Sequence, residues 1–257
     1  MSKGIYVFDF CLVVGDIVIG PTVFAFALTI MAGLSTGIGS TIAYFIREPK
    51  LTYLSYLMGF SAGVMIFVSF VELLGTSIDV MGLLPASIAF FGGIVGIYVI
   101  DKFIPHVHMD THPDSFHESV ENRDELAQAG VLTAVGIALH NFPEGIAVLT
   151  VSLESISLGI PIALAIAVHN IPEGIAVSVP IYYATGDEKK AFGYSFFSGV
   201  AEPIGAAIGF LLLMPFMNEF ILHVILAAVG GVMVFISFDE LLPISKDYGN
   251  EHLSSMG

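Results

Sequence analysis

Long apolar runs dominate this chain, and polar residues gather in the breaks between them. Seven runs are long enough to cross a bilayer as helices, which takes about 20 apolar residues each. They cover residues 21–46, 51–74, 82–104, 127–153, 158–183, 191–216 and 221–242. The pattern predicts an all-α protein, in which a polytopic bundle of membrane helices forms a single transmembrane domain over residues 1–257.

Basic residues fall in alternate breaks or at their margins. Seven of the eight follow this parity: Arg47, Lys50, Lys102, Arg123, Lys189, Lys190 and Lys246. The breaks at 75–81, 154–157 and 217–220 contain none. Because cytoplasmic loops carry an excess of Lys and Arg, we expect the basic side to be cytoplasmic and the N-terminus to lie outside the cell (plasma or inner) membrane. Residues 1–20 are expected to form an N-terminal extension rather than a cleaved signal.

Composition narrows the chemistry further. The chain is 56% hydrophobic and 12% charged, which excludes an ordinary soluble domain. Cys11 is the only cysteine, so a disulfide framework and a thiolate metal cage are both excluded. The net charge of −15 favours cations near the surface. We expect the partners to be the lipid bilayer and divalent metal ions, with no nucleic acid and no catalytic cofactor; a homodimer is left open.

A nine-residue motif occurs twice in the middle of the predicted fourth and fifth helices. His140–Val148 reads HNFPEGIAV, and His169–Val177 reads HNIPEGIAV, so the copies differ at one position in nine. His, Asn and Glu are costly to bury inside a membrane and usually mark function there. Duplication of a helix-packing motif is the bland alternative, but packing needs neither His nor Glu.

The repeated residue types suit a divalent metal ion. His140 and Glu144 are four residues apart, as are His169 and Glu173, so each pair shares a helix face. Imidazole nitrogen and carboxylate oxygen suit zinc and comparable first-row ions. Glu202, in the sixth helix, is a further carboxylate at membrane depth. With Asn141 and Asn170 it could complete a second, adjacent site bridged by Glu144 and Glu173.

The flanking helices carry a second repeat. Residues 63–74 match residues 231–242 at nine of twelve positions, and residues 33–40 resemble residues 199–206 more weakly. By the loop parity the matched helices run in opposite directions, which predicts the inverted repeats of many secondary transporters. The counterpart of the third helix should begin near Asn250, so we expect an eighth helix, in a 3+2+3 order, of which this chain holds only the start.

Two further groups of polar residues admit more than one interpretation. The long cytoplasmic loop 105–126 carries His106, His108, His112 and His117 among acidic residues, a composition that either binds metal weakly or is simply solvated. Glu72, Asp239 and Glu240 lie near helix ends and could be interfacial or belong to an ion pathway. By symmetry Glu72 would lie near the outer mouth and Glu240 near the inner one. Ser and Thr residues within the helices are interpreted as packing groups.

These residues resemble the ZIP (Zrt/Irt-like) family of divalent metal transporters, and most closely its bacterial ZupT-type branch. The likeness rests on the two motifs, Glu202, the His-bearing loop and the Asp239–Leu241 segment. It implies a binuclear site between helices four and five, formed by His140, Asn141, Glu144, His169, Asn170, Glu173 and Glu202. It also implies zinc uptake into the cytoplasm, with iron, manganese, cobalt or cadmium as further substrates of related members.

The sequence therefore predicts a metal-ion permease rather than an enzyme. In this hypothesis helices four and five move relative to the flanking repeats to alternate access. An intramembrane zinc-dependent hydrolase and a metal sensor that does not transport are the alternatives. The His-Glu-x-x-His signature of zinc proteases is absent, which weakens the first of these.

Overall fold

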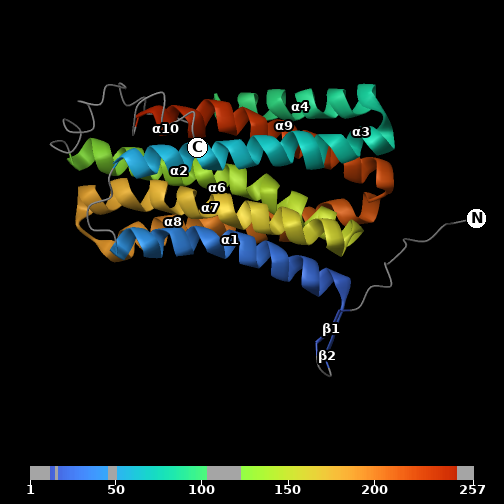
Figure 1. Ribbon diagram of the computed structural model, residues 1–257, viewed down its shortest axis with the longest axis horizontal. Helices are drawn as coiled ribbons and strands as arrows, with labels where there is room; N and C mark the ends of the chain where they lie inside the picture. The colour runs from blue at the N-terminus through green and yellow to red at the C-terminus, as the bar shows by residue number, and fades with distance from the viewer. Residues whose placement is uncertain (1–11, 15–16, 46–50, 103–122, 248–257) are drawn as a thin grey trace, which may run out of the picture.

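The computed structural model describes residues 12–14, 17–45, 51–102 and 123–247 of the chain. Seven helical stretches in this part are long and apolar enough to cross a membrane, and they lie side by side along the long axis of the molecule (Figure 1). The predicted polytopic helix bundle is confirmed. The histidines of loop 105–126 and the predicted start of an eighth helix lie outside the described residues.

The spans are built from α1 (Pro21–Phe45), α2 (Leu51–Phe67), α4 (Leu83–Asp101), α6 (Arg123–Glu154), α7 (Ile156–Thr185), α8 (Glu188–Leu213) and α9 (Glu219–Ile236). A π-helical segment η1 (Val68–Leu74) and helix α3 (Gly75–Met81) extend α2. A second π-helical segment η3 (Ser237–Leu241) and α10 (Leu242–Asp247) extend α9 in the same way. A single 3-10 turn, η2 (Met214–Phe216), follows α8.

A small hairpin precedes the bundle. Strands β1 (Leu12–Val14) and β2 (Ile17–Ile19) pair antiparallel, with Leu12 opposite Ile19, and project beside the start of α1 (Figure 1). These are the only strands in the part of the chain that the structure describes. The sequence did not predict them, but they lie in the expected N-terminal extension and leave the bundle itself all-α.

The expected break at residues 75–81 is wrong, because this segment is helical. Gly75 adopts right-handed helical angles, and the hydroxyls of Thr76 and Ser77 donate to carbonyl groups of the preceding turn. The chain turns instead at Gly82, whose φ of +83° is readily available only to glycine. The second span therefore runs about two turns further than predicted.

The helices pack as two units. Helices α1, α6, α7 and α8 pack closely on one another and are called here the motif unit, since α6 and α7 carry the repeated motif. Helices α2, α3, α4, α9 and α10, with η1 and η3, form the flanking unit. Figure 1 shows α1, α7 and α8 along one side of the bundle and α4 with α9 and α10 along the other.

The outer surface of the flanking unit is strongly apolar. Helix α4 exposes a row of large side chains: Leu83, Leu84, Ile88, Phe91, Val95 and Val99. A contiguous apolar face of this kind is unfavourable in water and marks contact with a partner or a membrane. The seven predicted metal ligands are instead buried inside the bundle.

Candidate metal site

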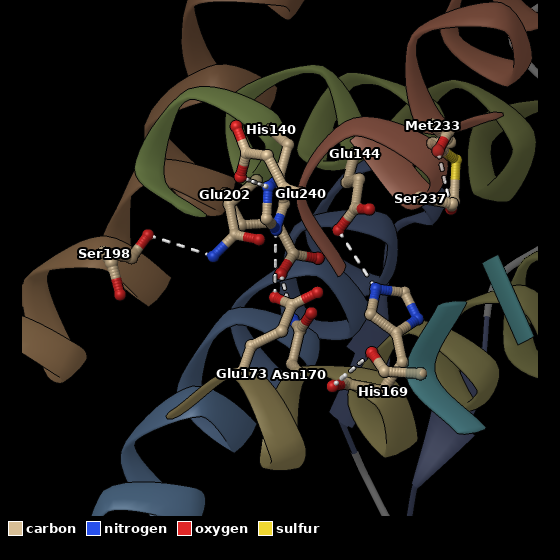
Figure 2. Close-up of polar contacts among 12 residues, drawn as sticks. His140, Glu144, His169, Asn170, Glu173, Ser198, Glu202, Met233, Ser237 and Glu240 are labelled. Atoms are coloured by element: carbon tan, nitrogen blue, oxygen red, sulfur yellow. Dashed lines mark hydrogen bonds and ion pairs between the residues drawn. The ribbon is translucent and has the colours of Figure 1, made fainter. Parts of the chain in front are cut away.

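The two motif copies meet where α6 and α7 pack together. All seven predicted metal ligands are fully buried there: His140, Asn141, Glu144, His169, Asn170, Glu173 and Glu202. Figure 2 shows the His and Glu side chains of the two helices pointing toward one another, with Glu202 from α8 beside them. The structure thus buries all seven residues. Contacts join six of them in pairs, whereas Asn141 bonds to Ser198 of α8.

Both helices continue through the motif prolines. Pro143 and Pro172 lie inside α6 and α7, where each removes a backbone donor from the carbonyl group four residues earlier. Neighbouring helices can support such positions within a membrane protein. The prolines therefore loosen the helical hydrogen bonding next to His140 and His169 without ending either helix.

Glycines in the motif fix the distance to the neighbouring helices. A Cβ atom at Gly145 would overlap the carbonyl oxygen of Glu202 on α8, and one at Gly174 would overlap that of Thr36 on α1. Each motif copy therefore packs directly on the backbone of one flanking helix, in the manner of small-residue contacts between membrane helices.

Each motif histidine lies against the glutamate of the other copy. Nε2 of His140 is 3.1 Å from Oε2 of Glu173, and Nε2 of His169 is 3.3 Å from Oε2 of Glu144. Two ligands of a tetrahedral zinc ion, each about 2.1 Å from the metal, are about 3.4 Å apart. The separations between the helices thus match one edge of such a coordination sphere.

The two asparagines are held by backbone carbonyl groups. Nδ2 of Asn141 donates to the carbonyl oxygen of Ser198 at 3.0 Å, and Nδ2 of Asn170 donates to that of Ala32, also at 3.0 Å. Asn170 additionally donates to Oε2 of Glu202 at 2.8 Å. Both amide groups are thereby fixed in orientation, and their Oδ1 atoms have no hydrogen-bond partner.

Unsatisfied polar atoms are concentrated at this site. In the described part of the chain, twelve buried side-chain nitrogen or oxygen atoms lack a hydrogen-bond partner, and nine of them belong to the seven predicted ligands. Six of the nine are oxygen atoms, among them Oε1 of Glu144, of Glu173 and of Glu202, whereas Oε2 of Glu173 has only its ion pair with His140. Buried polar groups are costly unless they are paired or coordinate a metal, so a divalent cation would satisfy this set.

The ligands are close together but do not form a ready coordination sphere. Among the described residues, no three His, Cys, Asp or Glu side chains converge with the geometry of a metal site. The histidines instead pair one-to-one with the glutamates. Binding an ion would therefore require these side chains to turn from each other toward a common point.

Residues left ambiguous by the sequence take distinct places. Oε2 of Glu240, in η3 of the flanking unit, lies 4.0 Å from Nδ1 of His140, which brings it to the edge of the site. Glu72, its counterpart in η1, is half-buried and lines a cavity of about 320 Å³ between α2, η1 and α7. The other lining residues include Phe60, Val64, Phe67, Pro161 and Ile162. Asp239 is exposed. From the sequence, both an interfacial role and a place on an ion pathway were open for Glu72 and Glu240.

Comparison with known proteins gives a consistent result. The family described as ZIP Zinc transporter matches residues 77–256. A protein named zinc transporter ZupT from Streptococcus mutans is 51% identical over 241 residues, which cover 91% of each chain. A zinc transporter ZupT from Clostridium perfringens is 50% identical over 91% of this chain and 90% of its own length. One from Nitratidesulfovibrio vulgaris is 47% identical over 93% of each chain.

Proposed function

This chain belongs to the ZIP family of zinc transporters, and we propose that it carries zinc ions across the cell membrane into the cytoplasm. The observation that carries this proposal is the pair of His–Glu contacts between α6 and α7, buried at the centre of seven membrane-spanning helices. Relatives named as transporters favour this reading over a hydrolase or a sensor that does not transport.

The proposed site holds two ions. His140, Glu144, His169 and Glu173 bind the first, and Asn141, Glu144, Asn170, Glu173 and Glu202 bind the second, so that Glu144 and Glu173 bridge them. Three carboxylates then offset most of the charge of two divalent ions. The unsatisfied atoms described above support this assignment, since every one of these residues contributes at least one.

The moving part is larger than helices four and five alone. Gly145 packs on the backbone of α8 and Gly174 on that of α1, contacts too close to slide without separating the helices. We therefore extend the predicted moving element to the whole motif unit, which shifts against the flanking unit. This packing supports alternating access by relative motion of two bodies, as expected for a transporter with inverted repeats.

Residues of the flanking unit mark the two ends of the path. Glu72 lines the cavity between α2 and α7 and would attract a hydrated cation from outside. Glu240 contacts His140 and would receive the ion on the cytoplasmic side. This direction follows from the distribution of Lys and Arg, which favours an external N-terminus in a cell (inner) membrane.

Zinc is the proposed cargo because imidazole and carboxylate ligands suit it and because the relatives are named zinc transporters. The same ligands accept Fe²⁺, Mn²⁺, Co²⁺ and Cd²⁺, with selectivity depending on geometry and supply. A homodimer is compatible with this account, although the proposed ion path lies within one chain.

Zinc flux into proteoliposomes tests the function. The purified wild type is compared with a Glu144→Gln, Glu173→Gln double variant, which removes both bridging carboxylates while keeping their size. The matched control is Glu188→Gln, Glu219→Gln, which changes two exposed glutamates at helix starts. We expect flux in the wild type and control and none in the site variant. Equal flux in all three would contradict the proposal.

A further inference from the structure

Helices α1 and α8 contact the motif helices in equivalent ways. Each residue of α1 that makes these contacts corresponds to the residue of α8 that lies 166 positions later, since 199 − 33 is 166. The α1 residues are Ala32, Gly33, Thr36 and Gly39. Ala32 and its counterpart Ser198 both accept a hydrogen bond from a motif asparagine at 3.0 Å. Gly39 and Gly205 both pack so closely on a motif helix that an added Cβ would overlap its backbone.

The same correspondence places Thr36 opposite Glu202. The carbonyl oxygen of Thr36 packs on Gly174, as that of Glu202 packs on Gly145. A Cβ at Gly199 would lie 2.8 Å from Cβ of Thr36, and a Cβ at Gly33 would lie 3.2 Å from Cβ of Glu202. The side chains of Thr36 and Glu202 therefore leave their helices at equivalent points on either side of the place where α1 meets α8.

The hydroxyl of Thr36 is unusual among the buried threonines that the structure describes. Thr36 is fully buried, yet its Oγ1 atom has no hydrogen-bond partner. Thr29 and Thr150 donate to the carbonyl group four residues earlier, at 3.0 and 2.6 Å. That is the usual way to satisfy a hydroxyl within a helix.

A competing set of donors explains the exception. The carbonyl group four residues before Thr36 belongs to Ala32. Its oxygen already accepts hydrogen bonds from Oγ of Ser35 at 2.5 Å and from Nδ2 of Asn170 at 3.0 Å. The asparagine that orients the metal site thus occupies the acceptor that Thr36 would normally use. The free hydroxyl faces Gly199 of α8, about one helical turn before Glu202, and retains both its proton and its lone pairs.

We propose that Thr36 is a further binding residue of the transporter, whose hydroxyl holds a water molecule of the second metal ion from the side opposite Glu202. The inference rests on the proposed two-ion function. A hydroxyl oxygen can bridge to an ion through bound water at little cost relative to direct contact. The site is then asymmetric, with a carboxylate at one end and a neutral oxygen at the other, so the second ion is held less firmly than a fourth carboxylate would hold it.

Zinc binding to the purified full chain in detergent tests this role by calorimetry. Thr36→Val keeps the shape but removes the hydroxyl, Thr36→Ser restores it, and Thr29→Val is the control on the same helix. We expect Thr36→Val to weaken the second zinc equivalent about 3- to 10-fold, the effect of losing one hydrogen bond. Thr36→Ser should stay within about 2-fold of the wild type, and Thr29→Val should leave both equivalents unchanged.

Thermal unfolding without metal separates binding from packing. Since the hydroxyl is unpaired, Thr36→Val should unfold at the same temperature as the wild type or higher, although it binds zinc more weakly. The role of Thr36 would be overturned if Thr36→Val bound the second zinc ion as tightly as the wild type does. It would also be overturned if Thr36→Ser bound that ion as weakly as Thr36→Val. Either result would leave the two-ion site itself intact. A wild type that binds only one zinc ion would overturn the two-ion site, and this proposal with it.

Discussion

Oε2 of Glu240 lies 4.0 Å from Nδ1 of His140, so the last helical span of the flanking unit contacts the metal motif on α6. The equivalent residue of the other repeat, Glu72, instead lines a cavity between α2 and α7. The two halves of the molecule thus differ at matched glutamates. In the proposed alternating-access mechanism, this difference would correspond to one of the two access states.

Glu240 should matter for release rather than for binding. We expect Glu240→Gln to lower zinc flux about 10-fold, as for loss of one charged contact, while zinc affinity stays within a few-fold of the wild type. Asp239→Asn is the matched control, because the neighbouring side chain is exposed. Flux assays and calorimetry on the same preparations separate the two effects, and equal flux in both variants would remove Glu240 from the path.

The two motif histidines should be equally important. His140 and His169 make equivalent contacts with Glu173 and Glu144. We therefore expect His140→Ala and His169→Ala each to lower the affinity for the first zinc ion by at least about 10- to 100-fold. A loss of this size follows even from removing a residue that only supports a metal ligand. His223→Gln is the control, since His223 is equally buried but bonds to the carbonyl group of Glu219. Calorimetry measures the zinc affinity of each variant. A large loss of affinity from only one of the two histidine substitutions would contradict the symmetric assignment.

Close helix packing at the motif glycines should be intolerant of added volume. Gly145→Ala and Gly174→Ala each force a Cβ onto a neighbouring backbone, so we expect losses of about 1–3 kcal/mol in unfolding free energy. Gly193→Ala on α8 meets nothing within 4 Å and should stabilise the protein by about 0.5–1 kcal/mol. Thermal unfolding in detergent measures all three, and similar melting temperatures for Gly145→Ala and Gly193→Ala would refute the packing argument.

Cross-links distinguish motion between the units from motion within one. Glu154 of α6 and His223 of α9 lie 3.8 Å apart across the two units. Phe26 and Phe210 pack edge to face within the motif unit, with ring centroids 5.6 Å apart. After Cys11→Ser, each position pair is changed to cysteine and joined by a short thiol-cleavable reagent.

The first cross-link should stop zinc flux until it is cleaved, while the second should leave flux unchanged. If the link between Phe26→Cys and Phe210→Cys also stops flux, α1 and α8 move relative to each other and the motif unit is not one body.

Much of the architecture could be predicted from the sequence because its signals are local. Apolar length predicted the seven spans, and the match of residues 63–74 with 231–242 predicted matched helices. Both segments in fact contain a π-helical stretch, η1 and η3, so the repeat extends to a distortion that no residue pattern had indicated. The helix at Gly75–Met81 was missed because its polar hydroxyls resembled a loop, although they bond within the helix.

The site was less completely predictable because it depends on which helices touch. The repeated motif identified six of the buried ligand candidates, and membrane depth identified Glu202, but neither indicated that α1 and α8 pack on Gly174 and Gly145. Thr36 was interpreted as a packing residue, and its unpaired hydroxyl could not be foreseen because Asn170 from another helix occupies the carbonyl group of Ala32. Contacts of this kind depend on three-dimensional packing and leave no local signal.

The most direct test of the central claim is to locate the ions in the protein. Crystals grown with zinc should give two anomalous difference peaks at the zinc absorption edge, both between α6 and α7. One peak should lie among His140, Glu144, His169 and Glu173, and the other beside Asn141, Asn170 and Glu202. Zinc peaks found elsewhere on the chain, with none between these helices, would contradict the account.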